Sequence, residues 1–272
     1  MSSPRETYLH GHHRSVLSAH SARTAEDAAA FLLPHIEPGM RLLDFGCGPG
    51  TITVGLADAV GSSGSVLGID ISDGLQTEWD LRLKETDATN LEFRVDDIYE
   101  TELEQGQFDV VYAHQILQHL AYPVGALKAA TRLAKRGGLV GIREVDWGTF
   151  AAFPESKALD DFRRVYDAVA IRNGGNPHAG RHVLEWMEAT GELTDIQITT
   201  STWTFYEESG KTWWGDQWSQ RILESDIAVK AIEYGIATRT ELEAISRGWQ
   251  EWKHAPGSVS CFTHFEGLAR RA

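Results

Sequence analysis

The sequence predicts an α/β fold: a doubly wound, mostly parallel sheet of seven strands with an antiparallel edge and helical cap insertions. Three observations support this prediction. Short apolar runs alternate with helical patterns over the first half of the chain, a glycine-rich turn joins the first run to a helix, and the alternation weakens after Trp147. Strands and helices that alternate in this way need crossover connections, which place helices on both faces of a parallel sheet.

The strands expected in the first half are short apolar runs bounded by glycine or polar residues. They cover residues 41–45, 65–70, 91–95, 108–113 and 137–145, and the helices between them cover 51–60, 73–86 and 123–134. An earlier helix is expected to begin after Thr24, because Thr24 with Asp27 three residues later is typical of an N-cap. Pro34 and Pro38 end this helix.

The second half is expected to be mostly helical, with two further strands. Helices are predicted at 156–171, 181–190 and over most of 207–252, and strands at 196–205 and 258–268. The last two strands form the antiparallel edge. We therefore expect an N-terminal arm over residues 1–23 and a single domain over 24–272, with helical insertions near 151–180 and 207–256.

Composition limits the class of protein. The 272 residues include 25 Lys and Arg against 39 Asp and Glu, which gives a formal charge of −14. Such a chain repels nucleic acid and anionic lipid, so neither is an expected partner. The two cysteines, Cys47 and Cys261, are expected to be free thiols in a reducing cytoplasm. No apolar run approaches the length of a membrane span, so a cytoplasmic protein without membrane insertion is predicted.

The most informative segment is Leu-Leu-Asp-Phe-Gly-Cys-Gly-Pro-Gly at 42–50, an apolar strand followed by three alternate glycines and a helix. Glycines at such a turn let the backbone approach a ligand, and the helix N-terminus offers free N–H groups. The spacing is G-x-G-x-G. A dinucleotide site needs its third glycine where Thr51 stands, which disfavours an NAD(P)-dependent oxidoreductase.

Acidic residues end the strands that follow the glycine turn. Asp70 lies twenty residues after Gly50, where it can accept both hydroxyls of a ribose. Asp97 ends the next strand, where it can accept from an adenine amino group while Ile98 packs on the ring; Asp96 is the alternative if the register differs by one. Together with Asp44, these acids lie along the carboxyl edge of the sheet, the expected ligand crevice.

At this point the sequence resembles the class I S-adenosylmethionine-dependent methyltransferases, especially the small-molecule enzymes of the ubiquinone/menaquinone-biosynthesis type. The resemblance covers residues 24–147 and also uses Val-Leu-Gly-Ile-Asp-Ile-Ser at 66–72, Val-Asp-Asp-Ile at 95–98 and the segment 108–120. It implies S-adenosylmethionine as cofactor and S-adenosylhomocysteine as product. The cofactor-binding residues that it implies, beside Gly50, are Asp44, Gly46, Cys47, Gly48, Asp70, Ile71, Asp97, Ile98, His114 and Gln115.

Within this resemblance Asp44 is directed at the methionine amino group, and His114 and Gln115 line the methionine side. Ile71 packs on the adenine. On the N-terminal arm, Tyr8 closes the pocket as a candidate catalytic residue, and Arg23 meets the methionine carboxylate.

Methyl transfer needs a positioned nucleophile and sometimes a base. His114 and His119 are the candidate bases, although the sequence favours a structural role for His119. A metal site at His10, His12 and His13 lacks a carboxylate or thiol partner, so none is predicted.

The acceptor is expected to meet an aromatic wall. Trp213 and Trp214 lie in the helical insertion and Trp147 follows the fifth strand, so all three are candidate substrate-binding residues, with core packing as the alternative. Arg143 shares that strand end with Glu144 and Asp146 and either orients substrate or forms an ion pair.

The predicted function is methyl transfer to a small apolar or aromatic acceptor through oxygen, nitrogen, carbon or sulfur. The rivals are a cofactor-binding module without methyl transfer activity and an NAD(P)-dependent oxidoreductase. The sequence leaves open whether the chain forms a homodimer and whether the helical insertions are a lid or a subunit contact.

Overall fold

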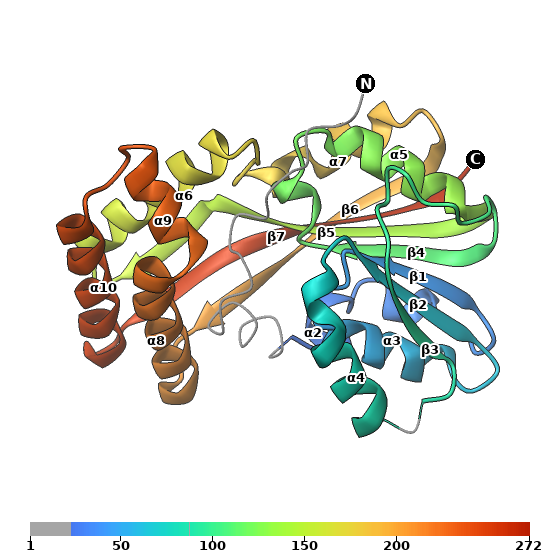
Figure 1. Cartoon of the computed structure of the whole chain (residues 1–272), viewed down its shortest axis with the longest axis horizontal. Coiled ribbons are helices and arrows are strands. Elements are labelled where there is room, and N and C mark those ends of the chain that lie inside the picture. Colours follow the sequence, from blue (N-terminus) through green and yellow to red (C-terminus); the bar gives the residue numbers. More distant parts are fainter. Residues whose placement is uncertain (1–22, 87) are drawn as a thin grey trace.

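A computed structural model describes residues 23–86 and 88–272. Its centre is a seven-stranded sheet in the order β3-β2-β1-β4-β5-β7-β6, in which β7 is antiparallel to both neighbours (Figure 1). The strands are β1 Arg41–Phe45, β2 Ser65–Asp70, β3 Leu91–Val95, β4 Phe108–His114, β5 Ala134–Phe153, β6 Leu193–Phe205 and β7 Val259–Arg271. The predicted fold class is therefore confirmed, including its antiparallel edge, in which the structure places β7 between β5 and β6.

Helices cover both faces of the parallel part. One face packs on α2 (Ala25–Ala28) and α3 (Thr51–Val60), and the other on α5 (Pro123–Leu133) and α7 (Val183–Ala189). The helix α4 (Gln76–Glu85) follows the short helix η2 (Asp73–Leu75) and contributes Trp79 to a small cluster beneath the glycine turn. Short 3₁₀ helices are η1 (Leu33–His35), η3 (Leu117–His119) and η4 (Ala179–His182).

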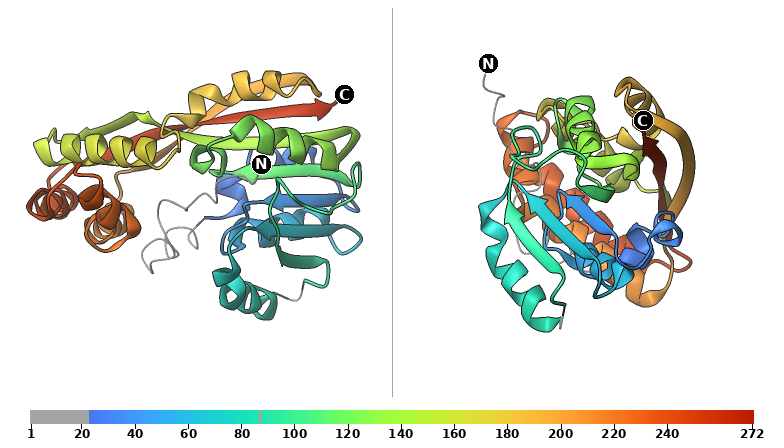
Figure 2. Two further views of the ribbon diagram at one scale, coloured as in Figure 1. Left: turned by 45° about the horizontal axis from the view of Figure 1, so that its top comes forward. Right: turned by 90° about the vertical axis from the view of Figure 1, so that its right-hand side faces the viewer.

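The remaining helices form a cap at one end of the sheet. They are α6 (Lys157–Arg172), α8 (Glu208–Glu224), α9 (Asp226–Glu233) and α10 (Arg239–His254). Figures 1 and 2 show them gathered around the far ends of β5, β6 and β7, which run on beyond the parallel strands. The cap has its own aromatic core, with Trp218 and Trp249 almost fully buried.

Two predicted boundaries were wrong. The fifth strand, expected over 137–145, spans 20 residues from Ala134 to Phe153, because beyond a register shift it pairs with β7 again from Ala151 and packs its apolar side chains on the cap. The N-terminal helix, expected as one unit up to the prolines, is a four-residue helix followed by η1, although Thr24 caps it as predicted by accepting from the Asp27 N–H. No helix in residues 23–86 or 88–272 is long and apolar enough to cross a membrane.

Candidate active site

The glycine turn between β1 and α3 forms a cradle that only glycine can build. Gly46, Gly48 and Gly50 have φ values of 71°, 54° and 82°, which side chains rarely adopt. A Cβ at Gly46 would lie 2.7 Å from Ile116 Cγ1, and one at Gly50 would overlap the Phe93 ring. Conformation and space therefore both require glycine here, and the backbone stays open to a ligand.

Asp70 fixes this turn from the end of β2. Its Oδ2 accepts from the Gly48 N–H at 3.0 Å and its Oδ1 from the Ser72 N–H at 3.0 Å. A carboxylate oxygen has a second lone pair, so both oxygens can also accept from a ribose hydroxyl.

The floor of the glycine turn depends on Trp79 and Phe93, which the sequence interpretation did not identify as site residues. Trp79 Nε1 donates to the Gly48 carbonyl at 2.8 Å and its ring stacks on Phe93 at 5.5 Å. Cys47 is buried in the same cluster, where desolvation raises the pKa of its thiol and keeps it neutral.

Asp44 lies buried at the end of β1, with 2% of its surface exposed. Thr53 Oγ1 donates to its Oδ2 at 2.7 Å. Burial raises the pKa of Asp44 to about 7, and the Thr53 hydrogen bond offsets part of that increase. The site therefore holds a carboxyl group that a nearby cation would ionise.

The two acids that follow β3, Asp96 and Asp97, differ in how strongly the protein itself engages them. Asp96 pairs with Arg94 and accepts from Thr101 Oγ1 at 2.8 Å, whereas Asp97 Oδ1 accepts from the Tyr99 N–H at 2.9 Å. This favours Asp97 over Asp96 as the adenine contact.

Next to Asp70, Ile71 is 62% exposed, which suits a residue that a bound ring would cover. Ile98 is buried in a core cluster of the sheet.

Gln115, directly after β4, contacts two residues that are distant in the sequence, Arg23 and His264. Arg23 Nη2 donates to its Oε1 at 3.0 Å, and its Nε2 lies 2.7 Å from His264 Nε2. Burial lowers the pKa of His264 well below its usual value, so the ring is neutral and its Nε2 accepts. Gln115 itself has a φ of 53°, a strained conformation typical of functional positions.

His114 precedes Gln115 and is 6% exposed. Its ring lies 6.0 Å from that of His264 and 6.1 Å from that of Trp203. These contacts place His114 in the packing beneath Gln115.

Beside Gln115 opens a cavity of about 500 Å³ between the sheet and the cap, which we call the cap cavity. The described residues that line it are Arg23, Gln115, Gln118, His119, Trp147, Tyr166, Trp203, Trp213, Trp214, Gln217, Trp218, Arg221 and Phe262. Aromatic side chains dominate its wall. Trp214 stacks on Phe205 at 4.3 Å and Trp147 stacks on Phe262 at 4.9 Å, so the predicted wall is also part of the cap core.

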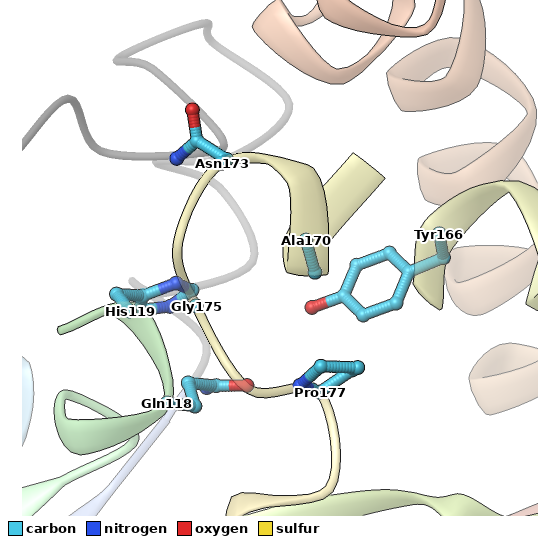
Figure 3. A pocket seen from close by; sticks show the side chains of 7 residues that line it. All are labelled: Gln118, His119, Tyr166, Ala170, Asn173, Gly175 and Pro177. Carbon is cyan, nitrogen blue, oxygen red and sulfur yellow. The ribbon is translucent and has the colours of Figure 1, made fainter. Parts of the chain in front are cut away.

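A smaller pocket of about 230 Å³ adjoins the cap cavity and shares Gln118, His119 and Tyr166 with it (Figure 3). In Figure 3, His119 and Tyr166 lie on opposite sides of the segment 173–177. Burial, together with the positive charges of Arg23 and Lys230, lowers the pKa of His119 to about 3. The imidazole is therefore neutral at physiological pH.

The charged residues in the middle of β5, where the sequence predicted the end of this strand, are engaged within the protein. Arg143 is fully buried, donates to Ser201 Oγ at 2.9 Å and pairs with Glu266 at 3.3 Å. Among the described residues it does not line either pocket. This geometry favours the ion-pair interpretation of Arg143, which we do not place in contact with the acceptor.

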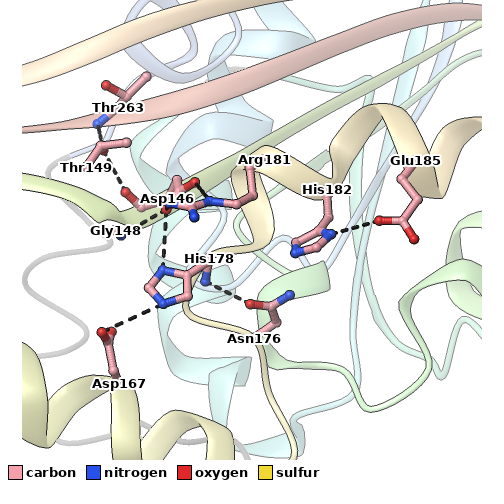
Figure 4. Close-up of polar contacts among 10 residues, drawn as sticks. All are labelled: Asp146, Gly148, Thr149, Asp167, Asn176, His178, Arg181, His182, Glu185 and Thr263. Atoms are coloured by element: carbon pink, nitrogen blue, oxygen red, sulfur yellow. Dashed lines mark hydrogen bonds and ion pairs between the residues drawn. The ribbon is translucent and has the colours of Figure 1, made fainter.

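Glu144 and Asp146 on the same strand also hold the protein together. Glu144 Oε1 accepts from the Ile116 and Leu117 N–H groups at 2.9 and 2.7 Å, which fixes η3. Asp146 binds Arg181 through both oxygens, at 2.5 and 2.9 Å, and lies 3.4 Å from His178 Nδ1 (Figure 4).

Comparison with known proteins identifies the family. A family model for a methyltransferase domain matches residues 36–204. The chain is 32% identical over 277 residues to an uncharacterized methyltransferase of Schizosaccharomyces pombe. This match covers 98% of this chain and 97% of that protein. The chain belongs to the methyltransferase domain family.

Other comparisons agree with this assignment. A protein of Aspergillus luteorubrus named "Probable methyltransferase" is 33% identical over 279 residues, 96% of each chain. The structure of a geranyl diphosphate C-methyltransferase from Streptomyces coelicolor superposes with a TM-score of 0.52 at 17% identity, covering 90% of this chain and 75% of that one, and shows the shared fold.

The likeness to quinone-biosynthesis enzymes is only partial. A demethylmenaquinone methyltransferase of Lactococcus lactis is 32% identical over 121 residues, which is 44% of this chain and 48% of that protein. The broad prediction of a class I methyltransferase is thus confirmed, while the two relatives above that match nearly the whole chain are not named as quinone-biosynthesis enzymes.

The methyltransferase is an enzyme that uses S-adenosylmethionine, and its residues fit that cofactor. The open glycine cradle, the Asp70 oxygens and exposed Ile71 suit the nucleoside, and Asp44 with Gln115 suits the methionine end. Tyr8 and the histidines at 10, 12 and 13 lie outside the described residues. Among residues 23–86 and 88–272, no group of three His, Cys, Asp or Glu side chains could hold a metal ion.

Proposed function

We propose that this methyltransferase transfers a methyl group to a small, flat, apolar or aromatic acceptor that binds in the cap cavity. The observation that carries the proposal is that Gln115 belongs both to the strand end expected at the methionine side and to the cavity lining. An acceptor against the aromatic wall would therefore adjoin the donor.

The donor S-adenosylmethionine supplies an electrophilic methyl carbon on a positively charged sulfur. The protein has to align the nucleophile with that carbon and exclude water. Trp147, Trp213 and Trp214 provide the wall that does both. Arg23, whose Nη2 donates to Gln115 Oε1, binds the methionine carboxylate in this proposal.

His119 lines the cavity as a neutral imidazole with a pKa of about 3. A ring of that acidity is a weak base but a good hydrogen-bond acceptor. We therefore propose that His119 orients the acceptor by hydrogen bonding. The titration of His119 is then expected to add no pH dependence to the methyl-transfer rate between pH 5 and 8. His114, packed against His264, supports this site from below.

The acceptor class rests on the cap cavity and not on the partial likeness to demethylmenaquinone methyltransferase, which covers less than half of this chain. The cofactor-binding module without methyl transfer is the rival that an activity assay separates.

The test has two stages. Calorimetric titration of the ligand-stripped protein is expected to show micromolar binding of S-adenosylmethionine and S-adenosylhomocysteine and none of NAD. A screen of flat aromatic compounds for formation of S-adenosylhomocysteine then identifies acceptors.

A pair of tryptophan variants checks where the acceptor binds. Trp213→Leu is expected to raise the acceptor KM about tenfold, the scale of a lost aromatic contact with its burial. Trp186→Leu, on α7 and outside the described cavity lining, is expected to leave it unchanged. Cofactor binding without turnover of any acceptor would favour the binding module.

A further inference from the structure

Gln217 lies on the cavity-facing side of α8. Trp214 and Arg221 lie three and four residues from Gln217, and Trp218 lies four residues from Trp214, so the four side chains share one face of the helix, and all line the cap cavity. Gln217 is 6% exposed, which removes its amide from bulk water. A polar group in such a place needs a partner.

Among the described residues, neither the nitrogen nor the oxygen of the Gln217 amide has a hydrogen-bond partner. The indole N–H groups of Trp214 and Trp218 also lack partners in this part of the chain. Leaving a buried amide unsatisfied destabilises a protein by a few kcal/mol. Since Gln217 lines the cavity, the side from which a partner can come is the ligand side.

The outer face of the same helix shows no such deficit. Asp216 accepts from Gln250 at 2.9 Å and pairs with Lys253, and Gln220 donates to Glu224 at 2.8 Å. The unpaired amide is thus a property of the cavity face and not of α8 as a whole.

We propose that Gln217 recognises a hydrogen-bond donor and acceptor on adjacent atoms of a flat ring, as in a ring lactam or an enol beside a carbonyl. This inference rests on the proposed function and specifies its acceptor. A primary amide presents an N–H and a carbonyl oxygen in one plane, so it pairs with such a group through two parallel hydrogen bonds. The neighbouring tryptophans hold the ring itself.

The charged side chains that line the cap cavity further restrict the chemical class of the acceptor. The described lining contains Arg23 and Arg221 and no carboxylate. A positively charged amine would find no counter-ion there, whereas a neutral lactam or a partly ionised enol would be accepted. The acceptor is therefore neutral or weakly acidic.

The test uses the full chain saturated with S-adenosylhomocysteine, so that no turnover occurs. Two probes are titrated by calorimetry: 2-quinolone, which carries the lactam pair, and 2-methoxyquinoline, which has the same rings without the donor. The wild-type protein is expected to bind 2-quinolone at least about tenfold more tightly, the scale of a satisfied buried hydrogen-bonding group.

The variant Gln217→Leu keeps the volume and removes the amide. It is expected to bind both probes within about threefold of each other, while Gln220→Leu, one turn away on the exposed face, keeps the wild-type preference. Gln217→Leu is also expected to unfold at the same or a higher temperature than wild type without ligand, because an unsatisfied buried group is gone. If this variant does not fold, Gln217→Met also removes the amide donor and acceptor and is expected to lose the same preference.

The outcomes separate the two proposals. Equal binding of the probes to the wild type, or an unchanged preference in Gln217→Leu, would overturn the role of Gln217 and leave the aromatic acceptor in place. A lowered unfolding temperature of ligand-free Gln217→Leu would show a structural amide and overturn it as well. If neither probe binds the wild type and Trp213→Leu leaves acceptor turnover unchanged, the proposed aromatic acceptor itself fails.

Discussion

Asp44 offers the sharpest test of the cofactor site, because one substitution should change two properties in opposite directions. Its carboxyl is buried and has a pKa raised to about 7. If it meets the methionine amino group, only the ionised form binds well. Asp44→Asn removes that charge while keeping the shape and an oxygen that can still accept from Thr53.

The magnitudes follow from the pKa. With a value near 7, about a tenth of the protein is ionised at Asp44 at pH 6 and about nine tenths at pH 8, so affinity for S-adenosylmethionine should rise about ninefold between them. Stability moves the other way. A folded pKa above the ordinary 3.8 gives stability that is present below about pH 4 and is lost as the pH rises through 7, amounting to roughly 4 kcal/mol at pH 8.

The assay combines calorimetric titration at pH 6, 7 and 8 with urea unfolding of the ligand-free protein at pH 4 and 8. Asp44→Asn should bind more weakly at pH 8, lose the ninefold rise beyond what the ligand's own amino group contributes, and be more stable than wild type at pH 8 but not at pH 4. Glu144→Gln is the matched control, because burial also raises the pKa of Glu144, to about 8. It should alter the stability profile and leave the pH dependence of binding intact.

Two results would refute this reasoning. An Asp44→Asn protein that binds with the wild-type pH dependence would remove Asp44 from the cofactor contact. A variant that is less stable than wild type at pH 8 would mean that the ionised carboxylate is a structural requirement of the ligand-free fold.

Two further predictions concern the cradle. Asp70→Ala should weaken S-adenosylmethionine binding by about 1.5 to 3 kcal/mol, because it removes the ribose acceptor and the anchor of the turn, while exposed Asp73→Ala should leave binding unchanged in the same titration. Gly50→Ala should lower the free energy of unfolding in urea by roughly 2 to 5 kcal/mol, from a φ of 82° and an overlap with Phe93. Gly137→Ala, with a φ of 74° and open space around it, should lose only about 1 to 2 kcal/mol, so equal losses would contradict the steric argument.

The glycine turn and the acids at the sheet edge could be located from the sequence because their signals are local. The glycines, Asp70 and Asp97 each follow a strand within a few residues, and parallel strands place their carboxyl ends at one edge regardless of long-range detail. Trp79 escaped notice because nothing in its helix pattern shows that its indole reaches back 31 residues to Gly48.

The acceptor half could not be predicted in the same way, because it is assembled by antiparallel pairing across long separations. Arg143 stands opposite Glu266 in the register of β5 and β7, 123 residues apart, and that pairing decides that it is an ion pair. The contact of Gln115 with His264 spans 149 residues. Local alternation gives the existence of such strands but not the register that brings specific side chains together.

Buried polar groups in this methyltransferase differ in whether they lie beside open space, because Arg143 Nη1 and Glu144 Oε2 also lack partners among the described residues although neither residue lines the cap cavity or the smaller pocket. Arg143 is buried and paired with Glu266, so its burial alone does not indicate a ligand contact. Glu144 shows that a raised pKa is not sufficient either, since one of its oxygens takes two backbone N–H groups and anchors η3. Gln217 lines a cavity and lacks a partner among the described residues, and Asp44 ends a strand beside the open glycine cradle. A buried polar group that lacks a partner destabilises the ligand-free protein. Where such a group lies beside open space, a ligand is the expected partner, because its binding supplies the missing interaction.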